Sequence, residues 1–213
     1  MWGYAELGHH PAQVELAGKL GVTTQSVNQA VTELRVAGAV ADDRRRPIRL
    51  TALGTALARD AARRARLVEW LLADALRFGW ADIADEAPAW ARTLSPHALD
   101  RLDEQLGHPA ACPHGNPIPR AGPPQLDGRP LTDVEAGTAF TVLCVPELVG
   151  SPAMLQFLQD SAATPGAHGH VCDHGPGGTC VVHLPAGPVA LAADTARWLH
   201  VATRPASGRP TPE

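Results

Sequence analysis

The densest group of potential metal ligands lies in the C-terminal half of the chain, where six histidines and cysteines fall within sixteen residues: His168, His170, Cys172, His174, Cys180 and His183. Thiolate and imidazole suit Zn²⁺, an iron–sulfur cluster or haem iron, and two thiols can instead form a redox disulfide. Alternate strand residues share a face, and a hairpin centred near Pro176 would place Cys172 opposite Cys180. One interpretation is therefore a metal or redox site at His170, Cys172, His174 and Cys180. The other is solvated histidines beside a cysteine that packs as a small apolar residue, since the spacing is not C-x-x-C.

A second set of side chains suits contacts with DNA bases. Between Thr24 and Gly38 the sequence has helical periodicity, with an apolar face made by Val27, Val31 and Leu34. The opposite face carries small polar side chains: Gln25, Asn28, Gln29 and Thr32. Such residues hydrogen-bond base edges and let a helix approach the major groove closely. This face therefore predicts a recognition helix.

The elements around this helix have the order of a winged helix-turn-helix. An apolar helical repeat precedes it and stops at Gly21, and Thr23 or Thr24 can cap the recognition helix. The preceding repeat consists of Val14, Leu16, Ala17 and Leu20. We therefore predict two helices joined by a tight turn.

The segment after Gly38 predicts a two-stranded wing. Val40 begins an extended segment, Asp42 and Asp43 supply turn chemistry, and the chain returns as a second strand toward Leu50. Its tip carries Arg44, Arg45 and Arg46. Each phosphate that an arginine neutralises adds about 0.9 to the salt slope of DNA binding. A charge run alone is more often a solvated loop, but its position after a helix-turn-helix favours DNA contact.

Length, charge and cysteine content limit the class of protein. The 213 residues suffice for two or three small domains, and the net charge is −4. Residues 1–64 nevertheless carry nine Arg and Lys against six Asp and Glu, as expected of a chain that presents one basic face to nucleic acid. No membrane-length apolar run or signal-peptide pattern is present, so a cytoplasmic location and no membrane partner are expected. The four scattered cysteines favour thiols or metal ligands over structural disulfides.

A helical region follows the winged helix. The periodicity predicts one long helix over 52–76, then helices over 80–93 and 95–107, the last capped by Ser95 with Pro96 at its first position. These helices cannot bury much apolar surface alone. Because this small region also carries three tryptophans, Trp70, Trp80 and Trp90, we predict that it forms a dimer interface.

The rest of the chain predicts a small β-barrel. We assign residues 1–64 to the winged helix, 65–120 to helical dimerisation, 121–128 to a linker, 129–202 to the barrel and 203–213 to a disordered tail. Strands are expected at 140–145, 169–172, 180–184, 189–191 and 198–201, with a helix at 152–160. The predicted fold class is α+β.

The chain resembles the diphtheria toxin repressor (DtxR) family of iron- or manganese-dependent transcriptional repressors. The resemblance spans nearly the whole chain and is carried by LTALG after the wing, RLVEWLLADAL, ADEAPAW, LGHPAACPHGNPIP, PLTDVEAGTAFTVLCV and TPGAHGHV. It implies a FeoA-type barrel, a dimerisation and metal-binding segment at 65–120, and dimers on a palindromic operator of double-stranded DNA. The residues expected at DNA are Thr23, Thr24, Gln25, Ser26, Asn28, Gln29, Arg44, Arg45 and Arg46.

The same resemblance implies that most of the family's metal ligands are replaced here. Of a His and Glu pair four residues apart in the long helix, only Glu69 remains, and the histidine position is Ala65. The other positions at which the family has ligands read Ala84, Pro88, Ala91, Arg92 and Ala153, while Gln156 is retained. Alanine and proline cannot coordinate Fe²⁺ or Mn²⁺, and the N-terminal helix that carries a further ligand is short here. Cys112 and His114 belong to a common family block, where a structural role is expected.

The sequence therefore favours a homodimeric DNA-binding regulator whose usual Fe or Mn site is degenerate. One alternative is a regulator that senses a metal, an iron–sulfur cluster, haem or redox state through the barrel's Cys and His cluster. Another is a metal- or cofactor-binding protein whose winged helix serves protein contacts. An enzyme is not expected, since GPGG at 175–178 precedes a strand and no Ser or Cys has a locally supported His partner. The cofactor stays open among Fe, Mn, Zn, an iron–sulfur cluster and none.

Overall fold

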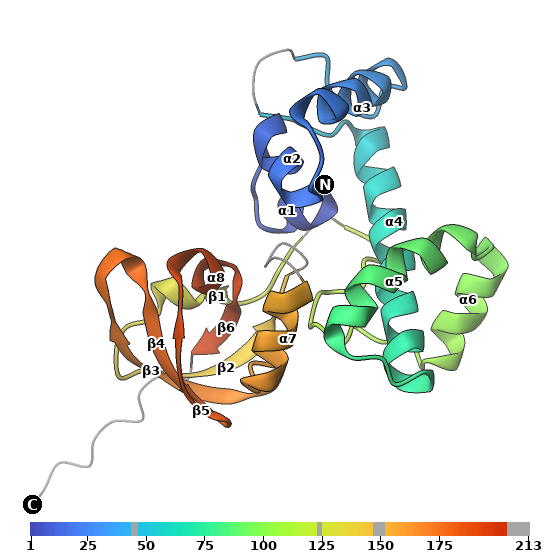
Figure 1. The fold of residues 1–213 in the computed structure, drawn as a ribbon. Coiled ribbons are helices and arrows are strands. Elements are labelled where there is room, and N and C mark those ends of the chain that lie inside the picture. Colours follow the sequence, from blue (N-terminus) through green and yellow to red (C-terminus); the bar gives the residue numbers. More distant parts are fainter. Residues whose placement is uncertain (44–46, 123–124, 147–151, 204–213) are drawn as a thin grey trace, which may run out of the picture. The chain divides into compact units, whose positions relative to one another are not determined.

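The computed structural model describes residues 1–43, 47–122, 125–146 and 152–203 (Figure 1). The chain forms two compact units. One comprises Met1–Ala75, Glu86–Cys112 and Pro117–Leu126, and the other comprises Leu76–Asp85, Pro113–Asn116 and Asp127–Glu213. Within the described ranges, no helix is long and apolar enough to cross a membrane. The α+β fold class predicted from the sequence is confirmed.

The first unit begins with the predicted helix-turn-helix. A short helix, α1 (Trp2–Glu6), comes first, and the helix-turn-helix consists of α2 (Gln13–Leu20) and α3 (Thr24–Val36). Gly21 ends α2 with a φ of 64°, a left-handed conformation that glycine adopts without steric cost. The Thr23 side chain accepts a hydrogen bond from the Ser26 amide at 3.1 Å, so Thr23 is the N-cap of α3.

The apolar face of α3 is shorter than predicted. Val27 and Val31 are buried with Leu16 and Ala17 of α2, but Leu34 is 41% exposed. Leu34 lies in the last turn of α3, after which the chain turns at Gly38, and the Leu34 carbonyl accepts a hydrogen bond from the Ala39 amide at 2.8 Å. The inward position predicted for Leu34 is therefore wrong.

The described part of the wing has less strand pairing than the two full strands predicted. Among the described residues, it consists of an isolated antiparallel bridge between Val40 and Leu50. Beside it, the Ala41 amide donates to the Arg49 carbonyl at 2.9 Å. Pro47 has no backbone N–H to extend such a ladder. The predicted tip, Arg44, Arg45 and Arg46, lies outside the described residues.

The long helix leaves the wing at a close backbone contact. Thr51 caps α4 (Ala52–Trp70), and a Cβ added to Gly54 would lie 1.8 Å from the Ala39 carbonyl oxygen. Only glycine fits that position. The helix continues as a π-helical turn at Leu71–Ala75, so the predicted helix over 52–76 is confirmed with a change of hydrogen-bond pattern near its end.

Two further helices follow, the first with the predicted bounds and the second shorter at both ends than the predicted 95–107. They are α5 (Trp80–Thr93) and α6 (Pro96–Gln105), and Ser95 caps α6 by accepting from the Ala98 amide at 3.2 Å. In the first unit a small apolar core joins α4, α6 and the segment that ends at Arg120. Its members are Leu67, Leu99 and Ile118, with Trp70, Leu94, Leu102 and Leu106 packed against them.

The second unit is built on a six-stranded antiparallel sheet in the order β1-β6-β2-β3-β4-β5. The strands are β1 (Arg129–Pro130), β2 (Ala139–Cys144), β3 (His168–His174), β4 (Cys180–Leu184), β5 (Gly187–Leu191) and β6 (His200–Thr203). The connecting helices are α7 (Pro152–Asp160) and α8 (Ala193–Trp198). The prediction that the last strand starts at Trp198 is wrong, because Trp198 ends α8 and β6 begins at His200. The predicted tail lies outside the described residues apart from Thr203.

The three tryptophans predicted to contribute to an interface differ in exposure. Trp70 is partly buried and its indole N–H donates to the Ala111 carbonyl at 2.6 Å. Trp80 belongs to the core of the second unit. Trp90 is 38% exposed. The chain itself therefore covers Trp70 and Trp80, and Trp90 is the tryptophan of the three that offers a large surface to a partner.

Candidate nucleic-acid interface and metal centre

The residues predicted to read DNA lie together on one exposed face of α3 and the turn before it. Thr23, Thr24, Gln25, Ser26, Asn28 and Gln29 are all exposed. Several hold one another in place. Gln13 of α2 donates to the Asn28 side-chain oxygen at 3.4 Å, and the Gln29 amide donates to Glu33 at 3.1 Å. The hydroxyl groups of Thr23 and Ser26 lie 2.8 Å apart in the helix cap.

One described arginine of the wing is exposed. Arg49 is exposed on the return segment, and Arg44, Arg45 and Arg46 lie outside the described residues. Arg35 is engaged by the chain itself, since its Nε lies 3.6 Å from the Asp42 carboxylate and donates to the Ala41 carbonyl. Arg49 was absent from the predicted set, because a single arginine within a strand pattern gives no signal of which way it faces.

The Cys and His cluster of the second unit does not assemble as predicted. His174 pairs with Cys180 and His170 with His183, and the register shifts between Val171 and Asp173. The hairpin places His174, not Cys172, opposite Cys180, so that register prediction is wrong. Cys172 lies at the register shift and is exposed. The turn is centred near Gly177 instead of Pro176, and one residue of difference in the turn moves every pairing of the hairpin.

The cluster's members instead form separate pairs. The rings of His170 and His183 stack with centroids 5.3 Å apart. His174 lies 3.5 Å from the Cys180 sulfur, and its other ring nitrogen lies 2.8 Å from the Val134 carbonyl oxygen. Burial raises the pKa of the Cys180 thiol, which favours the protonated form over the thiolate that a metal requires.

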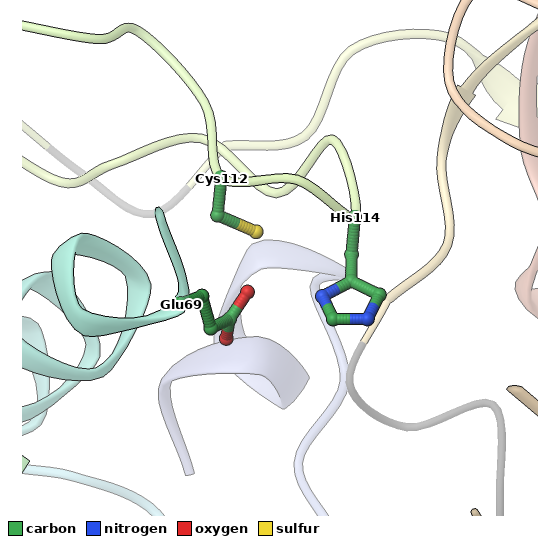
Figure 2. Close-up of side chains that lie close together, drawn as sticks. All are labelled: Glu69, Cys112 and His114. Atoms are coloured by element: carbon green, nitrogen blue, oxygen red, sulfur yellow. The ribbon is translucent and has the colours of Figure 1, made fainter. Parts of the chain in front are cut away.

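The described residues contain one group of three side chains that can hold a metal ion: Glu69, Cys112 and His114. One ligand atom from each lies within 4.8 Å of the other two, and all three residues are buried. Figure 2 shows the carboxylate, the thiol and the imidazole converging on one point. Glu69 was predicted as a surviving ligand, whereas Cys112 and His114 were assigned a structural role.

The surrounding backbone explains how these side chains meet. Glu69 lies in the last turn of α4, and the next residue, Trp70, donates to the carbonyl of Ala111 at 2.6 Å. An antiparallel bridge between Ala111 and Pro117 folds the CPHGNPIP block back on itself, and the Ile118 amide donates to the Ala110 carbonyl at 2.8 Å. Cys112 and His114 therefore project from one short loop whose base is fixed on α4.

The His114 side of this loop is fixed as firmly. Its ring packs against the indole of Trp80, with centroids 4.7 Å apart, and its carbonyl accepts the Val145 amide at 2.8 Å. Asn116 donates to the Val145 carbonyl at 3.2 Å. Gly115 has a φ of 82°, and a Cβ there would lie 2.1 Å from the Leu143 carbonyl oxygen, so glycine is required for this approach.

An ion pair lies one helical turn before Glu69. Arg66 is fully buried and forms two hydrogen bonds of 2.6 Å with the carboxylate of Glu6. The same guanidinium donates to the carbonyl of Pro117 in the CPHGNPIP block. No local pattern in the sequence indicates this pair, because Glu6 and Arg66 are sixty residues apart.

Comparisons with known proteins agree on one group. Residues 51–120 match the model of a family described as "Iron dependent repressor, metal binding and dimerisation domain". The iron-dependent repressor IdeR of Mycobacterium bovis is 30% identical over 192 residues, covering 84% of this chain and 83% of the relative, and that of Mycobacterium tuberculosis gives the same values. The diphtheria toxin repressor of Corynebacterium jeikeium is 32% identical over 114 residues, covering 54% of this chain and 48% of that protein.

Solved structures show the same fold over nearly the whole chain. The manganese regulator SloR superposes with a TM-score of 0.82 at 23% identity, covering 95% of this chain and 94% of that chain. A manganese-dependent transcriptional repressor in complex with manganese gives a TM-score of 0.81 at 23% identity, covering 95% and 98%. The order of elements in both units is therefore one that already occurs in solved proteins.

Proposed function

We propose that this chain, which belongs to the diphtheria toxin repressor (DtxR) family of metal-dependent transcriptional regulators, represses transcription by binding double-stranded operator DNA as a homodimer. The observation that carries the proposal is the exposed polar face of α3, held by the Thr23 cap and the packing of Val27 and Val31 on α2. A helix so supported can enter a major groove with its N-terminal residues against base edges.

Each part of the interface has a separate task in this proposal. Gln25, Asn28 and Gln29 read bases, since amide side chains match the donor and acceptor pattern of adenine. Thr23, Thr24 and Ser26 at the helix start contact phosphates, which a helix N-terminus attracts. The wing residues Arg44, Arg45 and Arg46 neutralise further phosphates, and exposed Arg49 is added to this group.

The homodimer is supported by the matched segment at 51–120, whose family description names dimerisation. Apolar side chains are exposed on the helices of this segment: Leu53, Leu57 and Trp90. A second copy that covers them would place two recognition helices on one palindromic site, as two-fold symmetry requires. A protein that binds chromosomal operators must share their compartment, so the proposal includes a cytoplasmic location.

Metal control in this chain cannot use most of the ligand positions of its family. Ala65, Ala84, Pro88 and Ala91 offer no donor atom, and exposed Arg92 carries the wrong charge for a cation site. Sensing through the barrel cysteines is not part of the proposal, since the structure separates Cys172 from Cys180. Glu69 is the one carboxylate of the inherited set.

Fluorescence anisotropy with promoter fragments from the protein's own locus tests the DNA-binding function. We expect specific binding, and the logarithm of its association constant should fall linearly with the logarithm of the salt concentration. The double variant Arg44→Ala and Arg45→Ala should reduce the magnitude of that slope by about 1.8, because each of two lost phosphate contacts contributes about 0.9. The titration is repeated with EDTA and with added Fe²⁺, Mn²⁺ and Zn²⁺.

A matched control is Arg101→Ala, which removes an exposed arginine of α6 that pairs with Glu104. This variant should keep the wild-type slope. Absence of salt-dependent binding to any fragment under every metal condition, together with no effect of the double variant, would rule out the proposed function.

A further inference from the structure

We propose that Glu33 is a positioning residue for the recognition of DNA sequence, which holds the side-chain amide of Gln29 in the orientation that reads adenine. The inference rests on the proposed function and deepens it, because it assigns a base preference to one position of α3. Glu33 is exposed on α3 and is not one of the residues predicted to contact DNA.

Glu33 lies one helical turn after Gln29, on the same side of α3. Residues four apart on a helix are neighbours, and a glutamine and an acidic residue at this spacing form a stabilising side-chain hydrogen bond. Here the Gln29 Nε2 atom donates to the Glu33 Oε1 atom at 3.1 Å. Both residues are exposed, so the bond lies on the side of the helix where the proposed function places DNA.

This bond permits only one orientation of the Gln29 amide. A carboxylate accepts hydrogen bonds but does not donate them, so turning the amide over would bring its Oε1 oxygen against the oxygens of Glu33. The carboxylate uses one N–H of the amide, which leaves Oε1 and the second N–H for a base. Long side chains lose rotamer freedom when they bind, and a bond already formed in the free protein reduces that cost.

The groups left free on Gln29 match adenine better than the other bases. In the major groove adenine offers the N7 acceptor and the N6 amino donor, which pair with the free N–H and with Oε1. Cytosine offers a donor for Oε1 alone. Guanine and thymine would place an acceptor, O6 or O4, against Oε1. We therefore expect the order adenine, cytosine, then guanine and thymine at the base that Gln29 contacts.

The neighbouring amide of Asn28 is held less strictly. Gln13 of α2 donates to the Asn28 Oδ1 atom at 3.4 Å, but both partners are neutral amides, and each can donate or accept. Their bond therefore forms with either orientation of the Asn28 amide and selects neither. Gln13→Ala is accordingly a comparison variant that removes a hydrogen bond on the same face without fixing or freeing Gln29.

The affinity of the full-length protein for an operator selected from a random DNA library, and for all single base-pair variants of that operator, tests the inference. The variant Gln29→Ala identifies the base pair that Gln29 contacts, as the one at which discrimination is lost. At that pair the wild-type protein should prefer adenine over guanine by roughly 5- to 150-fold, the range for a bidentate contact.

Glu33→Met keeps the length of the side chain but offers no oxygen to the Gln29 amide. It should lower the adenine preference at that base pair at least about threefold, within the roughly 2- to 150-fold by which contacting residues are coupled. Discrimination at the other positions of the operator should stay unchanged. In the Gln29→Ala background, Glu33→Met should have no further effect on this preference.

Three further variants serve as controls. Glu33→Asp should retain most of the preference, because an aspartate four residues after a glutamine also accepts a hydrogen bond from its amide. Glu104→Gln, at an exposed glutamate of α6, should leave the preference at its wild-type value. Gln13→Ala should do the same at the base pair that Gln29 contacts.

The outcomes separate this inference from the proposed function. A wild-type protein that selects no DNA sequence would overturn both. Sequence selection by the wild type, with no base pair that depends on Gln29 or with an unchanged preference in Glu33→Met, would overturn the inference alone. So would equal losses in Glu33→Met and Glu33→Asp, or a loss spread over all operator positions, since either would indicate a change in the helix as a whole.

Discussion

The guanidinium of Arg66 binds the carboxylate of Glu6 through two parallel hydrogen bonds of 2.6 Å, with side-chain exposures of 0% and 4%. This pair joins α1, which precedes the helix-turn-helix, to the middle of α4. Because Arg66 also donates to Pro117, the same group holds the CPHGNPIP block. Three segments distant in sequence therefore depend on one buried charge.

Removing one partner of this pair should destabilise the protein strongly. Glu6→Gln keeps the size of the side chain but leaves the Arg66 charge buried without its carboxylate, and loss of one partner of a buried pair costs about 3 to 5 kcal/mol. The free energy of unfolding, measured by urea denaturation with far-ultraviolet circular dichroism, should fall by that amount. The double variant Glu6→Leu and Arg66→Met should recover most of it. A loss below about 1 kcal/mol in Glu6→Gln would contradict the assigned role.

The carboxylate of Asp103 should make the first unit sensitive to acid. Hydrogen bonds from Arg120 hold the pKa of Asp103 well below its usual range, with further hydrogen bonds from Arg63 and His108 outweighing the opposite effect of burial. Its folded pKa is lower than its unfolded value of about 3.9, so its stabilisation is complete above that pH and is lost as pH falls below it.

Asp103→Asn should therefore lower the melting temperature at pH 7 and flatten its decline between about pH 4 and pH 2. Calorimetry over that range measures the difference from wild type. Asp100→Asn is the matched control, since Asp100 is exposed and lies 3.5 Å from Arg63. An unchanged acid slope in Asp103→Asn, or an equal change in Asp100→Asn, would contradict this account of acid sensitivity.

Two cysteines of the second unit, Cys172 and Cys180, should be alkylated at very different rates. Cys172 is exposed, whereas Cys180 is buried and burial raises the pKa of its thiol, which lowers its thiolate fraction at neutral pH. Iodoacetamide at pH 7.5 should modify Cys172 first, as followed by mass spectrometry of the native protein. Comparable rates for both, or a disulfide joining them in air, would show that they approach each other in solution.

Local signals predicted much of the fold. Helix bounds at 80–93 and 152–160 were correct because the apolar spacing and the flanking start signals agree, and Gly21 and Ser95 act as the turn and cap that their residue types indicate. The recognition helix was predictable for the same reason, since its polar and apolar faces are set by residues within a few turns of each other.

Features that depend on tertiary packing were not predictable. Nothing in the spacing of Glu69 and Cys112 shows that the loop after α6 returns to the end of α4, and Arg66 and Glu6 meet only through that packing. The turn between β3 and β4 pairs His174 with Cys180, whereas the sequence prediction paired Cys172 with Cys180. Leu34 was assigned to the core from periodicity alone, whereas the turn at Gly38 leaves it exposed.

The most direct test of the central claim is the ratio of operator affinity to non-specific DNA affinity in the double variant Gln25→Ala and Asn28→Ala. With an operator selected from a random DNA library, we expect the ratio to fall at least about tenfold, since each bidentate base contact contributes about 1 to 3 kcal/mol. Non-specific affinity should change by less than about twofold, because phosphate contacts carry it. Gln105→Ala is the control, because Gln105 is an exposed glutamine at the end of α6 and outside the helix-turn-helix, and it should leave the ratio at its wild-type value. A double variant that keeps the wild-type ratio would contradict the assignment of α3 as the element that reads DNA.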